Sequence, residues 1–248
     1  MRARLCLLGL CALGIAGTAH AGRDELRSIV QQQCLPDWLR HHDPAPCRQV
    51  ELPGDPHASI DAGYAVLPDR KGGAHFLLIP LRRLGGIESP ALLQGQLPNY
   101  FAAAWRARGQ LDGHAPHPLR RAQVGLAINS RYSRGQDQLH IHIECQGAPL
   151  HAALVAHAGM LGPRWTALTV ADQDWLARRV MGETLEGIDP FRLLAAGVPG
   201  ARAHMARYTL IVAGMDYPQG PGFALLARRA FLHGGEALLD GSCAIAAR

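Results

Sequence analysis

The sequence predicts an α+β protein built on an antiparallel sheet that is flanked by helices. Apolar, β-prone runs follow one another in pairs, which is typical of β-hairpins. One of these runs alternates strictly between polar and apolar residues, as a strand with two unlike faces does. A segment with a helix-start signal lies between the pairs and can cover the apolar face of the sheet.

Length and composition favour a folded chain with a full core. The chain has 248 residues, 48% of them apolar, and no low-complexity run, so we expect residues 22–248 to form one domain. The formal net charge is +5, but no dense basic run or aromatic ladder occurs. We therefore expect no nucleic-acid partner.

The amino terminus has the pattern of an export signal. Arg2 and Arg4 precede an apolar run over Leu5–Ala16, and Ala19-His20-Ala21 supplies small residues at a cleavage position. The run is shorter than the roughly 20 residues of a comfortable transmembrane helix. We expect residues 1–21 to be a signal peptide or an uncleaved N-terminal membrane anchor.

The first half of the mature chain predicts a helix, a β-hairpin and a second helix in that order. The first helix should end where a Cys-Leu-Pro sequence interrupts it, and Asn99 is a suitable N-cap for the second. A polar, Gly-rich turn separates the hairpin strands. The expected bounds are Asp24–Gln33 for the first helix, Ala62–Leu67 and His75–Pro80 for the hairpin, and Tyr100–Arg108 for the second helix.

The central pair of runs completes a four-stranded antiparallel sheet. A strand over Ala122–Asn129 leads through a polar loop to a strand over Gln138–Cys145. In the second of these, Leu139, Ile141, Ile143 and Cys145 occupy the alternate positions, so their side chains form the buried face.

The remaining chain mixes helices and strands. Asp189 and Pro190 supply an N-cap and a first-turn proline for a helix that ends at Gly197. A second hairpin either continues the sheet or echoes the first hairpin as a degenerate duplication. The other expected bounds are His151–Leu161 and Trp175–Met181 for helices, and Trp165–Val170, Tyr208–Ala213 and Phe223–Arg228 for strands.

Four cysteines lie beyond the N-terminal segment, and an even number in an exported chain predicts disulfides. Three pairings are possible. We favour Cys34 with Cys47, which closes a short loop, and Cys145 with Cys243, which ties the C-terminal tail to the Gln138–Cys145 strand.

The polar positions of that strand carry the chemistry. Gln138, His140, His142 and Glu144 share one face, which we expect to be open. Neighbouring imidazoles on it lie roughly 6.5 to 7 Å apart along the strand, so both can address one phosphate or one metal. A strand His-x-His can bind zinc together with Glu144. Alternatively, one histidine attacks phosphorus, and surrounding donors hold the phosphate without a metal.

The polar loop before the strand supplies donors suited to anionic oxygens. Asn129 and Ser130 are candidate donors to a nucleotide sugar, with turn capping as the alternative. Gln136 is a candidate donor to phosphate oxygens, and Arg131 and Arg134 could clamp a pyrophosphate or simply be solvated.

Two resemblances bear on the choice between these chemistries. The run from Gln138 to Glu144 resembles the His-x-His-x-His-x-x core of the histidine-triad nucleotide hydrolases and transferases. The whole mature chain resembles more closely the bacterial CDP-diacylglycerol pyrophosphatase family. That resemblance rests on Cys34-Leu-Pro36, Pro46-Cys47, Ala62-Gly-Tyr64, Glu88-Ser-Pro90, Leu126 to Arg131, His140 to Ile143, Cys145 and Ala177 to Val180.

The resemblance implies a histidine-triad-like fold and the hydrolysis of CDP-diacylglycerol to CMP and phosphatidate, with no cofactor and no metal. His140 matches the middle histidine of the triad, the family nucleophile, and would form a cytidylyl-histidine. His142 matches the third histidine and would donate to phosphoryl oxygens. Gln138 stands at the first position, where an amide can orient its neighbours but cannot shuttle protons.

Two other functions are consistent with the residues. One is a zinc-dependent periplasmic hydrolase that uses His140, His142 and Glu144. The other is a non-catalytic periplasmic module that binds a nucleotide or lipid. The resemblance places the protein on the periplasmic side of the inner membrane, with the membrane surface as a partner. The sequence leaves the oligomeric state open.

Overall fold

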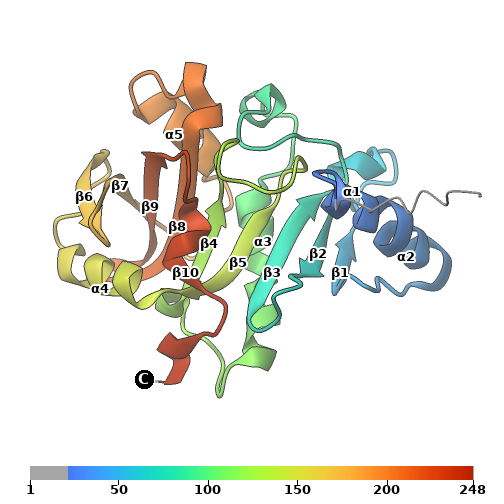
Figure 1. The fold of residues 1–248 in the computed structure, drawn as a ribbon, viewed down its shortest axis with the longest axis horizontal. Coiled ribbons are helices and arrows are strands. Elements are labelled where there is room, and N and C mark those ends of the chain that lie inside the picture. Colours follow the sequence, from blue (N-terminus) through green and yellow to red (C-terminus); the bar gives the residue numbers. More distant parts are fainter. Residues whose placement is uncertain (1–21, 248) are drawn as a thin grey trace, which may run out of the picture.

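The computed structural model describes residues 22–247, and the predicted signal or anchor over residues 1–21 lies outside them. In the described part of the chain, ten strands form one antiparallel sheet with a few helices against it (Figure 1), so the α+β prediction is confirmed. The strand order is β1-β2-β3-β5-β4-β8-β9-β7-β6, and the short β10 pairs with the end of β5.

The strands are β1 (Gln49–Glu51), β2 (Tyr64–Pro68), β3 (His75–Pro80), β4 (Val124–Ile128), β5 (Ile141–Gln146), β6 (Thr166–Val170), β7 (Gln173–Met181), β8 (Tyr208–Tyr217), β9 (Gly220–Arg229) and β10 (Leu239–Asp240). The α-helices are α1 (Glu25–Ile29), α2 (Leu35–His41), α3 (Tyr100–Ala107), α4 (Ala148–His157) and α5 (Pro190–Gly197). The predicted four-stranded core is present in the order β2-β3-β5-β4, and the C-terminal hairpin β8-β9 continues the same sheet.

The two faces of the sheet are covered differently. One face buries a single large cluster against α3 and α5, which includes Ile141, Ile143 and Cys145 of β5. The other face carries two separate apolar clusters. One of them packs β1 to β3 against the N-terminal helices, and the other packs β7 to β9 against α4. Strand β5 lies in the middle of the sheet, between these two clusters.

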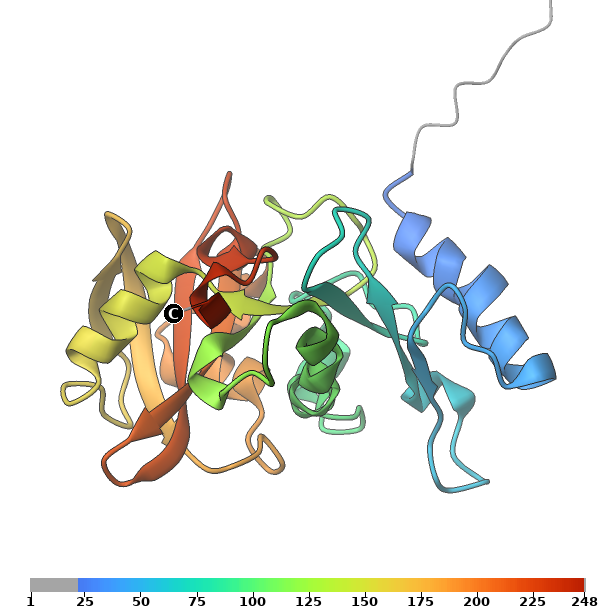
Figure 2. The same cartoon turned by 90° about the horizontal axis from the view of Figure 1, so that it is seen from below.

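The N-terminal helix is longer than predicted. A π-helical turn over Val30–Cys34 joins α1 directly to α2, and Figure 2 shows them as one continuous helical segment beside β1 to β3. The prediction that the helix ends before Pro36 is therefore wrong. Pro36 is the second residue of α2, which directly follows the π-helical turn.

The segment Trp175–Met181 was expected to be helical and is instead part of strand β7. Ala171 and Asp172 adopt positive φ and make a tight turn after β6, so Leu168 pairs directly with Trp175. Trp175 and Ala177 are buried at alternate positions, which is the strand period. Pairing with β6 and β9 outweighs the local helix preference of this segment.

Other expected elements are present with shifted ends. Asn99 Oδ1 accepts from Ala102 N at 3.0 Å, and Asp189 caps α5 through Phe191 N and Arg192 N, as predicted. Helix α4 starts at Ala148, three residues before the expected bound. Strands β8 and β9 extend to Tyr217 and Gly220, so the expected long turn shrinks to Pro218 and Gln219.

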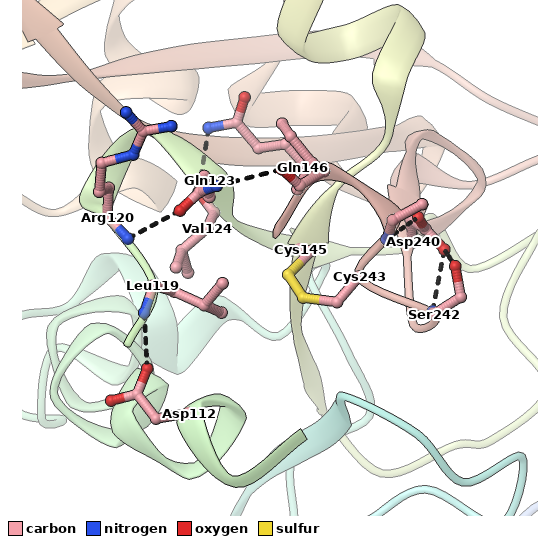
Figure 3. Close-up of a disulfide and its surroundings, with 12 residues drawn as sticks. Asp112, Leu119, Arg120, Gln123, Val124, Cys145, Gln146, Asp240, Ser242 and Cys243 are labelled. Atoms are coloured by element: carbon pink, nitrogen blue, oxygen red, sulfur yellow. Dashed lines mark hydrogen bonds between the residues drawn. A yellow bond between two sulfur atoms is a disulfide. The ribbon is translucent and has the colours of Figure 1, made fainter. Parts of the chain in front are cut away.

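Both favoured disulfides are present. Cys34 and Cys47 are joined with a Cα separation of 5.5 Å, and Cys145 and Cys243 with one of 5.1 Å. Figure 3 shows the second bridge linking β5 to the segment after β10, where Asp240 Oδ1 accepts from Ser242 N. Cys145 belongs to the cluster on the α3 side, so the bridge braces β5 from the face opposite His142.

Within residues 22–247, none of the helices has both the length and the apolar character that crossing a bilayer requires.

Candidate active site

The predicted histidine strand lies at the middle of the sheet, and its polar side chains fill the gap between the two apolar clusters. His142 pairs with Leu77 of β3 on one side and Ala127 of β4 on the other. Leu77 belongs to the cluster under α1 and α2, and Ala127 to the cluster under α4. Directly paired residues share a face of the sheet, so the imidazole lies between two apolar regions.

The expectation of an open face is wrong. The relative exposures are 7% for His140, 4% for His142 and 5% for Glu144. Helix α1 covers one side of this row of polar side chains, and a turn over Gly235–Leu238 covers the other side. The alternation of residues shows that the two faces of the strand differ. It does not show which distant segments of the chain pack over each face.

His140 stands immediately before β5 and has a defined tautomer. Its Nδ1 lies 2.8 Å from the carbonyl oxygen of Gln138. A carbonyl only accepts, so Nδ1 carries the proton and Nε2 is left with its lone pair. Burial, together with the neighbouring His142, lowers the pKa of His140 to about 4. A neutral imidazole with a free Nε2 is the form in which histidine acts as a nucleophile.

His140 and His142 both line a cavity of about 110 Å³ below α1, here called the inner cavity. Leu26, Ile29 and Leu77 supply apolar parts of its wall, and Gln136 supplies a polar part. Ligand pockets usually measure about 300 to 1,000 Å³. The inner cavity is therefore suited to one small group of a substrate, such as a phosphoryl group.

His142 contacts a polar neighbour at each ring nitrogen. Its Nδ1 lies 2.9 Å from His75 Nε2, and its Nε2 lies 2.8 Å from Glu236 Oε2. The second contact is short but poorly aligned, so the buried Nε2 has no well-formed hydrogen bond within the described chain. Burial raises the pKa of Glu236, but His142, Lys71 and Asn129 together outweigh burial and the pKa falls to about 2.

Two residues of this cluster were missed at the sequence level, His75 and Glu236. His75 begins β3 and pairs with Glu144, so its Nε2 lies 3.2 Å from Glu144 Oε1. Burial lowers the pKa of His75 and raises that of Glu144 to about 7. His75 and Leu77 lie two residues apart in a predicted strand, so the strand period places both side chains on the same face, and this could have been recognised from the sequence. Glu236 lies in an irregular turn and has no such signal.

A second hollow, the outer pocket, opens beside the cluster. It measures about 520 Å³, and His75, Glu144 and Glu236 line it together with Lys71 and Ser242. Glycines at positions 72, 73 and 241 form part of its wall, so few side chains crowd its entrance. Its volume is within the range of small-molecule pockets.

Gln138 holds the backbone rather than facing the inner cavity. Its Nε2 donates to the carbonyl oxygens of Pro80 and Arg82, at 3.0 and 2.9 Å. The side chain is almost fully buried. It therefore fastens the end of β3 to the residues that precede His140, which is consistent with an orienting role.

Asn129 and Ser130 lie at the end of β4 and contact the C-terminal segment. Asn129 Oδ1 accepts from Glu236 N at 3.5 Å, which places Asn129 beside the carboxylate that contacts His142. Ser130 Oγ donates to Ala230 O at 2.6 Å and accepts from Tyr132 N. Ser130 thus caps a turn and joins two loops, the alternative role considered for it.

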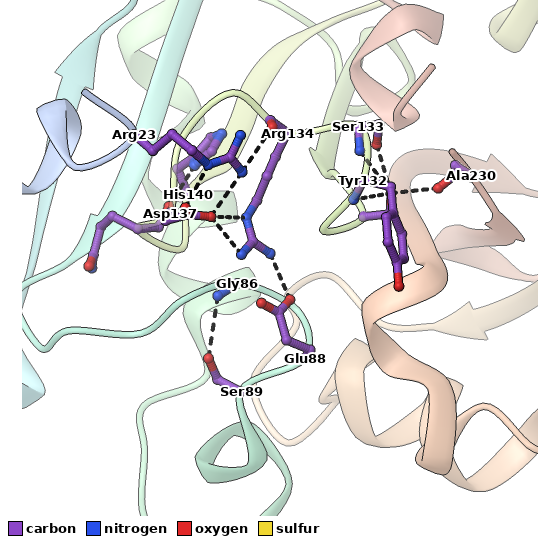
Figure 4. A network of polar contacts seen from close by, with 12 residues as sticks. Arg23, Gly86, Glu88, Ser89, Tyr132, Ser133, Arg134, Asp137, His140 and Ala230 are labelled. Carbon is purple, nitrogen blue, oxygen red and sulfur yellow. Dashed lines mark hydrogen bonds and ion pairs between the residues drawn. The ribbon is translucent and has the colours of Figure 1, made fainter. Parts of the chain in front are cut away.

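The two loop arginines are placed differently. Arg131 is exposed, whereas Arg134 is buried and its guanidinium is paired with Glu88 at 2.7 Å and Asp137 at 2.9 Å (Figure 4). Arg23 also pairs with Asp137. Arg134 therefore braces the loop that leads to His140. Gln136 Oε1 accepts from Leu26 N at 3.1 Å and ties the same loop to α1.

The structure therefore brings together His140, His142 and Glu144 of the predicted residues, with Gln136 at the cavity wall and Asn129 close to Glu236. It places Gln138, Ser130 and Arg134 in supporting contacts and Arg131 at the surface.

Comparisons with known proteins identify the family of the chain. The family model described as CDP-diacylglycerol pyrophosphatase matches residues 21–247. A CDP-diacylglycerol pyrophosphatase from Yersinia pestis is 39% identical over an alignment that covers 97% of this chain and 92% of the relative.

Proposed function

The chain belongs to the CDP-diacylglycerol pyrophosphatase family and hydrolyses CDP-diacylglycerol, and we propose that it does so through a covalent cytidylyl-histidine formed on His140. The observation that carries this proposal is the hydrogen bond from His140 Nδ1 to the Gln138 carbonyl. It leaves an unprotonated Nε2 on an imidazole that lines the inner cavity together with a second histidine.

In the first step, the Nε2 lone pair attacks the phosphorus of the cytidylyl group. The new N–P bond forms as the bond from phosphorus to the bridging oxygen breaks, and phosphatidate leaves with that electron pair. The imidazole becomes positively charged, and the Gln138 carbonyl stabilises the proton that stays on Nδ1. No proton has to leave His140 during the attack, which suits a buried imidazole.

His142 is proposed to stabilise the charge that develops on the phosphoryl oxygens. His142 lines the same cavity as His140, and its buried Nε2 lies 2.8 Å from the Glu236 carboxylate. A carboxylate oxygen only accepts, so the contact with Glu236 places a proton of His142 on Nε2. A donor that is fixed in place before the phosphate arrives is worth more than one that must reorient.

In the second step, water attacks the same phosphorus from the side that phosphatidate has left. The N–P bond breaks, its electron pair returns to His140, and CMP leaves with the water oxygen. The surplus proton passes to solvent. The imidazole is again neutral with its proton on Nδ1, so the cycle closes without a metal or a cofactor.

The pattern of Gln138, His140 and His142 next to a central antiparallel strand supports a histidine-triad-like arrangement. In this proposal, the bonds from Gln138 to Pro80 and Arg82 take the orienting role of the first triad histidine. The remaining loop residues contribute by holding this arrangement in place.

We further propose that the protein works on the periplasmic surface of the inner membrane, from which it takes its lipid substrate. The apolar run over Leu5–Ala16 supports export or anchoring. Tyr132, Phe231 and Leu232 supply a second feature, because they are exposed apolar side chains on the two loops that Ser130 joins. The rings of Tyr132 and Phe231 lie 5.3 Å apart. Such a patch suits contact with a bilayer.

The test is to trap the intermediate. The purified full chain is mixed with CDP-diacylglycerol that carries radioactive phosphorus in the cytidylyl group, and the reaction is quenched in base within milliseconds. We expect label on the chain that is stable in base and labile in acid, as a phosphoramidate is, and CMP release that persists in a strong chelator. Absence of label in the wild type during rapid turnover would exclude the covalent route.

A further inference from the structure

The cluster behind His142 has the geometry of a metal site. The atoms His75 Nε2, His142 Nδ1 and Glu144 Oε1 are separated by 2.9, 3.2 and 3.9 Å. Zinc bonds of about 2.0 to 2.2 Å in a tetrahedral arrangement place ligand atoms roughly 3.3 to 3.5 Å apart. The three separations bracket this range, and all three residues are buried.

We propose that His75, His142 and Glu144 bind one divalent transition metal ion of the zinc class. This ligand set differs from the predicted one of His140, His142 and Glu144, because His75 replaces His140. Two imidazoles and one carboxylate favour zinc or a similar ion over calcium or magnesium, which take oxygen ligands.

Each ligating histidine also has a carboxylate at its other ring nitrogen. Asp69 Oδ1 lies 3.6 Å from His75 Nδ1, and Glu236 Oε2 lies 2.8 Å from His142 Nε2. In protein metal sites, the outer nitrogen of a histidine ligand usually faces such a partner, which orients the ring and increases its basicity. This arrangement at both histidines is an independent indication that the pair is built to hold a cation.

The site has an entry path. His75 and Glu144 line the outer pocket of about 520 Å³, so an ion can reach them from solvent. Three protein ligands leave a fourth position, which water can fill. Gly73 and Gly241 lie at this wall, and no bulky side chain is contributed at these two positions.

The ion would sit behind His142 and outside the proposed reaction path. It binds through Nδ1, whereas the proposed phosphate donor is Nε2 on the other side of the ring. The bound ion occupies Nδ1 and so keeps the proton on Nε2, as the contact with Glu236 does without it. The position of the ion outside the reaction path rests on the proposed function, but the binding of the ion does not.

Binding is tested by equilibrium dialysis of the chelator-treated full chain against Zn²⁺. We expect one tightly bound ion per chain. His75→Gln and Glu144→Gln should each weaken that binding by at least about tenfold. His140→Gln is the matched control and should bind zinc as the wild type does, since His140 is next to the cluster but outside it. Thermal melting without zinc confirms that each variant folds.

Three results would overturn the proposed site. The first is that the wild type binds no stoichiometric zinc. The second is that His75→Gln and Glu144→Gln both bind zinc as the wild type does. The third is that His140→Gln loses zinc binding. The last would return His140 to the ligand set. Heat stability gives a second readout, because an ion that binds only the folded chain raises its melting temperature.

CMP release by the chelator-treated chain separates this proposal from the proposed function. Release without metal, combined with zinc binding, supports both. Release without zinc binding refutes the site and leaves the mechanism standing. If turnover requires zinc, the ion belongs to the reaction, and its position outside the reaction path is refuted.

Discussion

His140 donates its Nδ1 proton to the carbonyl oxygen of Gln138, two residues earlier in the chain, over 2.8 Å. The backbone therefore sets the tautomer of the imidazole, and no second side chain is needed to do so. Because burial also keeps the ring neutral, the free Nε2 is ready to attack a phosphorus in the inner cavity.

Replacing His140 should abolish turnover without unfolding the chain. We expect His140→Gln to lower the rate of CMP release by at least about 10³-fold, since it removes the proposed nucleophile. Glutamine is preferred to alanine because the site is buried and a cavity would cost stability. His151→Gln is the control. Turnover near the wild-type rate would rule out His140 as nucleophile.

Glu236 should act as a positioning residue for His142. Glu236→Gln removes the negative charge beside Nε2, so we expect kcat to fall by roughly tenfold or more while KM changes little. Steady-state kinetics measures both constants, and the exposed Glu183→Gln serves as the control. A change confined to KM would instead indicate that Glu236 contacts the substrate.

The pairing of Asp137 should make stability depend on pH in the acid range. Its hydrogen bond from Arg23, together with Arg134, depresses the pKa of Asp137 in the folded chain. The stabilisation is therefore fully present above the unfolded pKa of about 3.9 and is lost as the pH falls below it. We expect Asp137→Asn to cost about 1 kcal/mol at most at pH 7, because the pair is partly exposed to solvent.

The measurement is the melting temperature of the wild type and Asp137→Asn between pH 7 and pH 3. The difference should be constant at the upper end and should close below about pH 4. A difference that widens as the pH falls would contradict the assignment.

The two disulfides should contribute unequally. Cys34–Cys47 has a sequence separation of 13 and Cys145–Cys243 one of 98, so loop-closure entropy predicts about 3 and about 4.7 kcal/mol. Paired Cys→Ala variants, unfolded in urea, measure each contribution. We expect the Cys145/Cys243 variant to be the less stable of the two, and the reverse order would refute the loop-closure account.

Contact with a bilayer should involve the loop tips. Leu232 is 84% exposed, so Leu232→Ser should leave the fold intact. We expect it to lower CMP release from CDP-diacylglycerol in lipid vesicles but not from the detergent-dispersed substrate. Met160→Ser, which alters an exposed apolar residue after α4, is the control. Equal effects of Leu232→Ser on both substrate forms would argue against a membrane-contacting tip.

Part of the site could be predicted because its signals are local. The alternation over Gln138–Cys145 identified the face shared by His142 and Glu144, and the buried position of Cys145 followed from the same period. The caps Asn99 and Asp189 were predicted for the same reason, since a cap bonds to backbone groups two or three residues away.

The parts that could not be predicted depend on pairing across the chain. His75 reaches Glu144 through the register of β3 with β5, and Glu236 reaches His142 from a turn more than 90 residues later. Trp175–Met181 became a strand because β6 and β9 pair with it on both sides. Local propensity carries no information about such partners.

The sequence by itself determined the α+β class, the hairpin of β2 and β3, the His140 and His142 pair and the favoured disulfides, because each depends on short-range periodicity or on a small number of possible pairings. Only the tertiary structure decided that the histidine face is buried, that Arg134 is an internal brace, and that His75 and Glu236 complete the cluster. The physical reason is that burial and ion pairing are set by side chains from distant segments, which sheet register and the covering turn bring within about 3 Å of one another.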